Sequence, residues 1–121
     1  MPCSPSYDAA THRGYSTPAV AIGPDGNFHL FHDVVFDPMG FEQVAISRAY
    51  SSDGINFTEG GIDIISRGDA TWIDYEVRAP SPLFDGDQLK LYFAGNRDLA
   101  TVGPTGFESG VGLVTGTTTC P

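Results

Sequence analysis

The residues best suited to chemistry in this chain of 121 residues lie between Trp72 and Pro80. Glu76 is the strongest candidate for a general acid, because a carboxyl group can donate a proton to a leaving group. Asp74 lies two positions away and is the second candidate for a catalytic carboxylate. The competing interpretations are a loop carboxylate that is exposed or paired with an arginine, and a packing role for Trp72. Which interpretation holds depends on the strands and loops that position these residues.

Other histidine and acidic residues are explained by strands and turns rather than by metal binding. His29 and His32 are three residues apart on a predicted strand, so their side chains point to opposite faces and cannot share one ion. The segment Asp85-Gly86-Asp87 lacks the regular acidic pattern of a calcium-binding loop. We therefore expect no cofactor and no metal ion, with a structural calcium ion as the alternative.

Composition limits the classes of partner and of fold. A net charge of −9 argues against nucleic acid and against an anionic membrane as partners, because both attract basic proteins. No apolar run approaches the length of a membrane span, and the first residues lack the apolar stretch of a secretion signal. With 15 Gly, 9 Pro and only 17% charged residues, the chain suits many short strands joined by turns. These features predict an all-β domain.

The two cysteines, Cys3 and Cys120, lie near opposite ends of the chain. A disulfide bond between them would tie the termini together and would point to a secreted or periplasmic protein. Two free thiols are the alternative. The sequence therefore leaves the compartment open.

Two copies of one β-meander unit occupy most of the chain. Each copy has a strand led by proline, a turn containing Asp-Gly and a strand rich in aromatic residues, beginning at Pro18 and at Pro80. Both then start a third strand with Phe-Glu, at 41–42 and at 107–108. Glycine supplies the positive φ of such turns, and we expect both prolines to begin their strands, where a missing N–H breaks no ladder. A period of about 60 residues indicates the blades of a β-propeller.

The repeat divides a single domain, residues 1–121, into four parts. They are an N-terminal arm (1–15), blade one (16–66), a connecting loop (67–77) and blade two (78–116). A strand near residues 62–66 completes blade one as its fourth strand, and blade two has no counterpart. The predicted fold is therefore all-β, with two antiparallel propeller blades of the four-stranded type, the second incomplete.

These motifs resemble the five-bladed propeller glycosidases and their relatives, namely the family 43 arabinanases and xylosidases, the family 32 and 68 fructan enzymes and the family 130 phosphorylases. Blades of that group open with Asp-Pro and an apolar strand, followed by an Asp-Gly turn, an aromatic strand and a Ser-Asp-Gly-x-x-aromatic turn. The matching segments are 18–31, 51–57 and 78–95. The resemblance covers about two blades, and it implies glycosidase-like architecture.

The resemblance directs attention to Thr17 and Ala79. In that group, an Asp in front of the blade-opening proline acts as base, nucleophile or transition-state stabiliser, because the start of each inner strand faces the central cavity. Neither Thr nor Ala can replace such a carboxylate. Some relatives carry a Glu general acid two or three positions from Glu76. The residues suggested for ligand binding are Trp72, Tyr75, Arg78 and Thr17.

Two functions of different class follow. The first is a non-catalytic carbohydrate-binding or interaction module derived from a glycosidase-like propeller, which the missing Asp at positions 17 and 79 favours. The alternative is a partial or oligomeric glycoside hydrolase or phosphorylase acting on plant-type or fructan-type glycans. In that case Glu76 or Asp74 contributes to a site shared with other blades or subunits. The sequence leaves open whether the chain is an enzyme.

Two blades cannot close a ring, so their outer strands need a cover. A longer chain that supplies further blades is one solution, and a domain-swapped dimer is another. Assembly into a homo-oligomer is the third, in which two-bladed units reach six blades as a trimer and never five.

Overall fold

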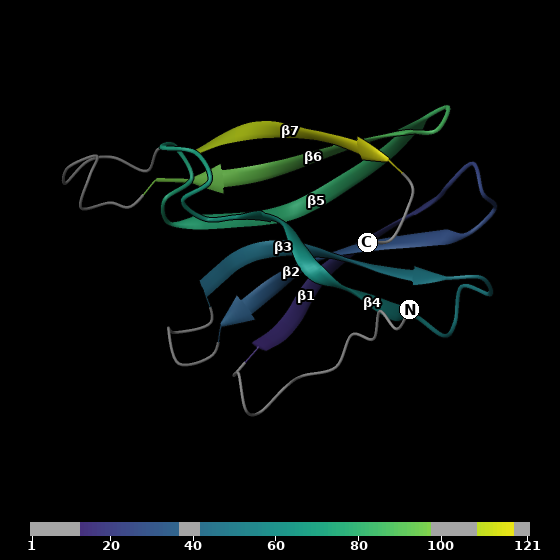
Figure 1. Ribbon diagram of the computed structural model, residues 1–121. Helices are drawn as coiled ribbons and strands as arrows, with labels where there is room; N and C mark the ends of the chain where they lie inside the picture. The colour runs from purple at the N-terminus through teal and green to yellow at the C-terminus, as the bar shows by residue number, and fades with distance from the viewer. Residues whose placement is uncertain (1–12, 37–41, 98–108, 118–121) are drawn as a thin grey trace.

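The computed structural model describes residues 13–36, 42–97 and 109–117, which form two stacked antiparallel sheets (Figure 1). Blade one has the strand order β1 (Arg13–Ile22), β2 (Phe28–Phe36), β3 (Glu42–Ser51) and β4 (Thr58–Ser66). Blade two has the order β5 (Glu76–Asp85), β6 (Gln88–Asn96) and β7 (Ser109–Thr117). The prediction of an all-β fold with a second, incomplete blade is confirmed for these residues.

Two strands begin at residues that differ from the boundaries predicted from the sequence. The first strand begins at Arg13, within the segment predicted as an arm, and β5 begins at Glu76, within the predicted connecting loop. The Phe-Glu match at Phe41 and at 107–108 lies outside the described residues. Within the described ranges, no helix has the length and apolarity needed to cross a membrane.

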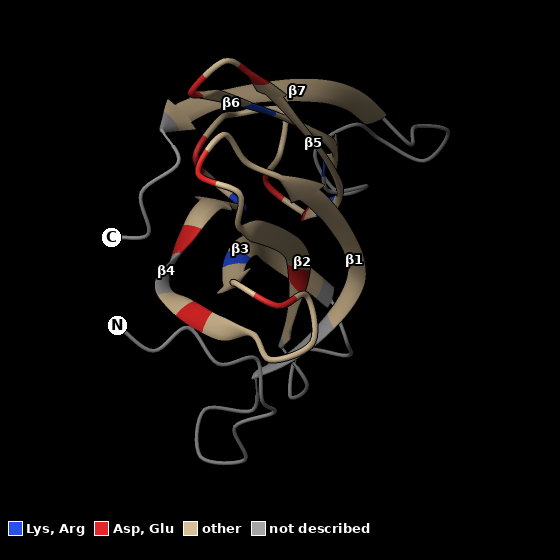
Figure 2. Cartoon of the chain, turned by 90° about the vertical axis from the view of Figure 1, so that its right-hand side faces the viewer, with Lys and Arg blue, Asp and Glu red and all other residues tan. Residues whose placement is uncertain are grey.

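The hairpin turns have the backbone that their glycines predict. Gly26, Gly54 and Gly86 have φ values of 80°, 75° and 61°, in the left-handed region that favours glycine. Asp53 accepts hydrogen bonds from the backbone N–H groups of Ile55 and Asn56, at 2.9 and 2.8 Å. Bonds from Asn56 to this carboxylate lower its pKa. Figure 2 looks onto the end of the molecule where these turns lie and shows acidic residues in red there.

Pro18 and Pro80 lie inside their strands, so the prediction that they begin them is wrong. The register of β1 against β2 shifts between Ser16 and Ala19. The register of β5 against β6 shifts at the equivalent place, between Arg78 and Ser81. A bulge takes a residue out of the hydrogen-bonded ladder, which is why proline is tolerated there.

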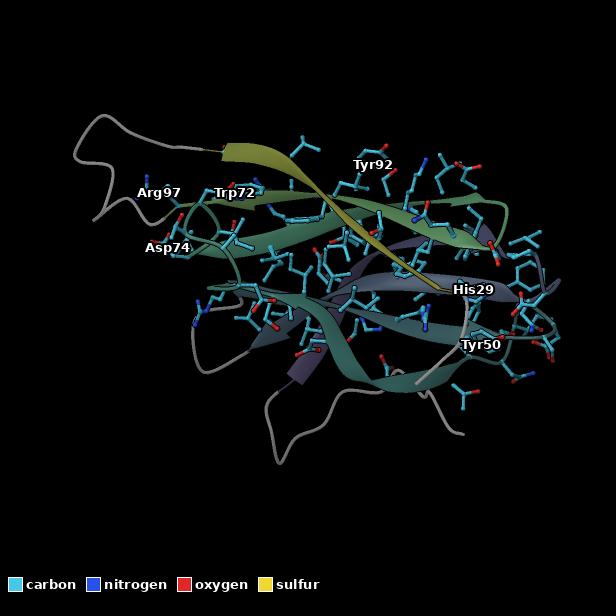
Figure 3. The ribbon with its side chains drawn as sticks, turned by 45° about the horizontal axis from the view of Figure 1, so that its top comes forward. His29, Tyr50, Trp72, Asp74, Tyr92 and Arg97 are labelled. Carbon is cyan, nitrogen blue, oxygen red and sulfur yellow. The ribbon has the colours of Figure 1, made fainter. Side chains whose placement is uncertain are left out.

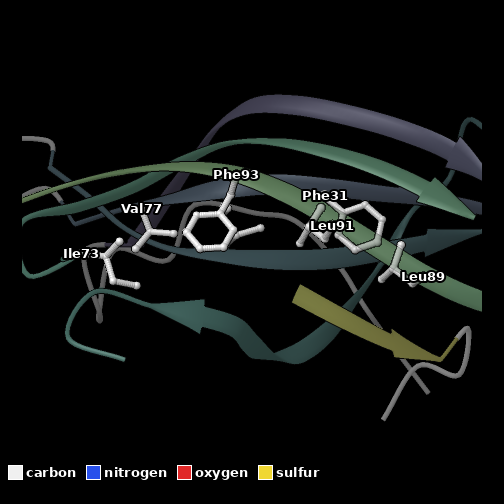
Figure 4. Packing of buried hydrophobic residues seen from close by; sticks show 7 residues of the cluster. Phe31, Ile73, Val77, Leu89, Leu91 and Phe93 are labelled. Carbon is white, nitrogen blue, oxygen red and sulfur yellow. The ribbon is translucent and has the colours of Figure 1, made fainter. Parts of the chain in front are cut away.

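The hydrophobic core lies between the two blades (Figure 4). Every member of the cluster is at most 4% exposed, and its members are Phe31, Ile46, Ile73, Val77, Leu89, Leu91 and Phe93. Full burial of one such side chain contributes about 1.5–3 kcal/mol. The core therefore forms the contact that holds one sheet on the other.

Glycines on β7 make room for the aromatic rings of this contact. A Cβ atom at Gly112 would lie 2.3 Å from Cζ of Phe93, and one at Gly110 would lie 3.1 Å from Cζ3 of Trp72. The Trp72 and Phe93 rings are stacked, with centroids 5.8 Å apart. Side chains at positions 110 and 112 would displace these two rings.

We expect Gly112→Ala to lower the free energy of unfolding by about 1–3 kcal/mol, because the added methyl group overpacks the Phe93 ring. Gly116→Ala is the matched control on the same strand, since a Cβ atom there meets nothing within 4 Å. It should change stability by less than about 0.5 kcal/mol. Urea unfolding of the parent and both variants measures the difference. Equal losses in the two variants would contradict this account of the packing.

Candidate functional site

The bulges of β1 and β5 place two unusual backbone conformations side by side. Thr17 has a φ of 48° and Ala79 a φ of 54°, both in the left-handed region. Their strands, β1 and β5, contact one another across the two sheets. A left-handed conformation costs a residue other than glycine on the order of 1–2 kcal/mol. Strained backbone of this kind is common at functional sites. The contact between the β1 and β5 bulges is therefore the candidate functional site.

Asp33 of β2 joins the two bulges. Its Oδ2 atom accepts a hydrogen bond from Thr17 Oγ1 at 2.5 Å, and its Oδ1 atom accepts one from the backbone N–H of Ala79 at 2.9 Å. The Asp33 side chain is completely buried. We call this arrangement of Asp33, Thr17 and Ala79 the Asp33 clamp. It links blade one to blade two through a carboxyl group that no ligand can touch.

Burial raises the pKa of Asp33, because a charged carboxylate loses its hydration. The hydrogen bonds from Thr17 and Ala79 oppose this shift in part. Asp33 was not among the site residues predicted from the sequence. The available signal was its position on the same strand face as His29 and Phe31, because a carboxyl group on a packed aromatic face needs partners.

Glu76 lies at the start of β5 and is held by two neighbours. Asn96, which is opposite it on β6 and fully buried, donates a hydrogen bond from Nδ2 to Glu76 Oε2 at 3.0 Å. Arg78 Nε lies 3.6 Å from the same oxygen, at ion-pair distance. The Glu76 side chain is 17% exposed and that of Arg78 is 42% exposed. Such a partly exposed pair adds little stability, so both groups retain the capacity to bind a ligand.

The segment before Glu76 is anchored mainly through its backbone. The N–H group of Tyr75 donates to the carbonyl oxygen of Asn96 at 3.1 Å, and its carbonyl oxygen accepts from Arg67 Nη1 at 3.5 Å. The Asp74 side chain is exposed, and Figure 3 shows it at the same end of the molecule as Trp72 and Arg97. This anchoring fixes the position at which β5 begins.

Trp72 lies in a different environment from Glu76 and Arg78. Its ring packs on Phe93, and it lines a hollow of about 400 Å³ together with Ile65, Ala70 and Leu113. The lining of this hollow includes none of Thr17, Tyr75, Glu76 or Arg78. The structure therefore brings Glu76 and Arg78 together, joins Thr17 to Ala79 through Asp33, and leaves Trp72 in a separate hollow.

The two histidines of β2 are both buried and face opposite sides of the sheet. His29 contacts Asp25 at 3.3 Å, and burial lowers the pKa of this histidine. His32 Nε2 lies 2.7 Å from Glu59 Oε1. In the ranges that the structure describes, no three His, Cys, Asp or Glu residues converge as a metal site would require.

Among the comparisons with known proteins, only the search of solved structures gave a match. Neither the models of protein families nor the curated proteins contain a match to the sequence. Among solved structures, the chain is similar to the GH43_1 enzyme from Xanthomonas citri complexed with xylotriose, at 18% sequence identity and a TM-score of 0.68. The alignment covers 88% of this chain and 29% of that one.

A second structure of the GH43_1 enzyme from Xanthomonas citri, complexed with xylose, matches with the same identity and TM-score and with 30% of that chain covered. The chain thus spans less than a third of the length of the structures that it resembles. At this low identity the likeness shows the fold. The two sheets have the fold of β-propeller blades.

The raised pKa of Asp33 should make the free energy of unfolding depend on pH. A folded pKa above the ordinary value of 3.8 means that the contribution of Asp33 is greatest below that value and is lost as pH rises through the folded pKa. The free energy of unfolding of the parent, relative to Asp33→Asn, should therefore increase as pH falls from about 7 toward about 4. Urea unfolding at several pH values measures this difference.

Asp53→Asn is a control for which the difference in stability from the parent should change with pH in the opposite direction. Because hydrogen bonds lower the pKa of Asp53, its contribution to stability is present above its ordinary pKa and is lost only as pH falls through the lower one. A pH-independent difference between the parent and Asp33→Asn would contradict the raised pKa.

Proposed function

We propose that this chain is a non-catalytic carbohydrate-binding or interaction module built from glycosidase-like propeller blades. One observation carries the proposal. The two bulge positions hold Thr17 and Ala79, and the carboxyl group that contacts both, Asp33, is fully buried. A group in that position supports the fold and is withheld from a substrate.

The chemistry of glycoside cleavage supports this choice. Cleavage ordinarily requires two carboxyl groups on either side of the scissile bond, one to donate a proton and one to activate water or to attack. Asp33 is enclosed by its clamp partners, and Glu76 already accepts a hydrogen bond from Asn96. Asp33, the carboxyl group that contacts both bulges, is therefore withheld from a catalytic pair with Glu76.

The same region offers groups suited to binding sugar hydroxyls. The guanidinium group of Arg78 provides several N–H donors and is partly exposed, while Glu76 provides acceptors. Thr17 is exposed at the neighbouring bulge. The GH43_1 structures that the chain resembles contain xylose or xylotriose, which makes a xylo-oligosaccharide the first ligand to test.

We expect the parent to bind xylotriose in isothermal titration calorimetry and Arg78→Ala to weaken that binding about tenfold, through loss of a charged donor. Lys90→Ala is the matched control, because Lys90 pairs with Asp85 at the opposite end of β5 and β6. Its affinity should equal that of the parent. Equal affinities for the parent and Arg78→Ala would place binding elsewhere.

The alternative function is a glycoside hydrolase seen in part, with Glu76 as the acid in a site completed by other blades or subunits. The position of Glu76 at the start of β5 and the limited share of the enzyme chains that is covered favour this second candidate. It predicts hydrolysis of an aryl xyloside that is lost in Glu76→Gln and retained in Asp85→Asn, a control at an exposed turn. The proposed binding module predicts no hydrolysis above the buffer rate in any of the three proteins.

A further inference from the structure

His29 connects the two blades near their hairpin turns. Its ring lies between two aromatic rings, with centroid distances of 4.6 Å to Tyr50 of β3 and 4.9 Å to Phe84 of β5. Tyr50 belongs to blade one and Phe84 to blade two. The His29 side chain is fully buried. We call this arrangement of His29, Tyr50 and Phe84 the His29 contact. In Figure 3, His29 and Tyr50 lie at the opposite end of the molecule from Trp72.

The two ring nitrogens of His29 have different surroundings. Nε2 lies 3.3 Å from Oδ1 of Asp25, in the turn between β1 and β2. A carboxylate oxygen accepts hydrogen bonds, so the N–H group of a neutral His29 is on Nε2. Within residues 13–36, 42–97 and 109–117, the buried Nδ1 atom has no hydrogen-bond partner. An imidazolium carries a second N–H group, which would be on Nδ1. Protonation of His29 therefore introduces both a charge and an unpaired donor into a buried contact.

Asp25 attracts a protonated His29 only weakly. Its Oδ2 atom accepts a hydrogen bond from Tyr50 Oη at 2.5 Å, and its Oδ1 atom accepts one from the backbone N–H of Asn27 at 3.0 Å. Its side chain is 28% exposed, so water also screens its charge. Burial acts to raise the pKa of Asp25, but the hydrogen bonds that it accepts, first that from Tyr50, together lower it. Asp25 therefore keeps its charge while histidine titrates, and His29 is the group that changes.

The other neighbours of His29 favour its neutral form. Arg48 of β3 carries a positive charge that repels an imidazolium. Ala21, the register partner of His29 on β1, and Phe84 of β5 bring no charge. Burial lowers the pKa of His29 because the cation loses its hydration, and Arg48 adds to this shift while Asp25 opposes it. Hydrogen bonding and charge thus agree that the contact accommodates a neutral imidazole.

We propose that protonation of His29 opens the contact between the blades at the hairpin-turn end. The protonated ring must hydrate its second N–H group, and water reaches this buried nitrogen only when a packed ring moves away. The Tyr50 hydroxyl group is held by Asp25 and by Asn27 Nδ2, the latter at 3.0 Å. Phe84 of blade two is therefore the ring that moves. Attraction between the cation and the two rings returns less than the lost hydration of a buried charge.

The Asp33 clamp responds to acid in the opposite direction. The folded pKa of His29 is below its ordinary value of 6.5, so its contribution to stability is complete above that value and is lost as pH falls through the folded pKa. The contribution of Asp33 grows over the same fall in pH. The two groups lie on β2, about 13 Å apart along the strand. Acid therefore releases the contact at Phe84 while the clamp holds β1 against β5. This response involves neither Glu76 nor Arg78, so it is independent of the proposed binding function.

NMR titration of isotope-labelled histidine measures the protonation of His29 directly. In the parent, His29 should carry its proton on Nε2 at neutral pH and should titrate below pH 6.5. Asp25→Asn should lower the pKa of His29 further, because the lost carboxylate no longer favours the cation. Asp53→Asn is the matched control at another hairpin turn, and it should leave this pKa unchanged because Asp53 bonds within its own turn. A His29 pKa above 6.5, or a proton on Nδ1 of the neutral ring, would exclude the proposal.

Hydrogen exchange locates the loosened region. After correction for the intrinsic effect of pH on exchange, peptides containing Phe84 should exchange severalfold faster at about pH 5 than at about pH 7 in the parent. The N–H group of Ala79, which is bonded to Asp33, should stay protected at both values. His29→Phe keeps an aromatic ring in the contact and removes the titrating group. Its exchange near Phe84 should therefore not depend on pH.

Two results of the exchange experiment would overturn the proposal. Unchanged or slower exchange in acid in the parent would show that protonated His29 keeps the contact closed. Exchange near Phe84 that quickens in acid to the same extent in His29→Phe would assign the response to another group. If His29→Phe does not fold, Asp25→Asn tests the same point, because its faster exchange must begin at a lower pH than in the parent. An unshifted onset would then contradict the role of His29.

Discussion

The Asp33 carboxyl group is the constraint on which the relative position of the blades depends. A buried carboxyl group is costly unless its oxygens are hydrogen-bonded, and here the partners are a hydroxyl group of one blade and a backbone N–H of the other. Satisfying both partners fixes β5 against β1. Because Glu76 and Arg78 lie on β5 immediately before this contact, the same bonds determine where the candidate binding groups lie.

The sequence predicts the features that depend on neighbouring residues. Positive φ at Gly26, Gly54 and Gly86 follows from Asp-Gly and its flanking strands, and the repeat follows from the order of these local signals. The prolines were misplaced because a bulge is a property of two strands together. Asp33 was missed as a site residue because its partners are 16 and 46 positions away, a separation at which no local pattern operates.

The candidate site was predictable only in part for the same reason. The interpretation of Glu76 as a carboxylate paired with an arginine was drawn from sequence, and the structure supplies Arg78, two positions further along the same strand, as the arginine at ion-pair distance. The bond from Asn96 to Glu76 requires the register of β5 against β6, which the sequence does not reveal. Trp72 has no such pairing, and its stacking on Phe93 depends on glycines of β7.

Residues 17 and 79 hold a left-handed backbone that Asp and Asn adopt more readily than Thr or Ala. The clamp bonds to the N–H of residue 79 and makes no use of its side chain. An acidic residue could therefore replace Ala79 while the hydrogen bond from the N–H of residue 79 to Asp33 is kept, and with less backbone strain. At residue 79 the backbone N–H holds the two blades together, while the side chain is free to vary. The protein can therefore gain or lose a reactive side chain at this position without losing the contact between its blades.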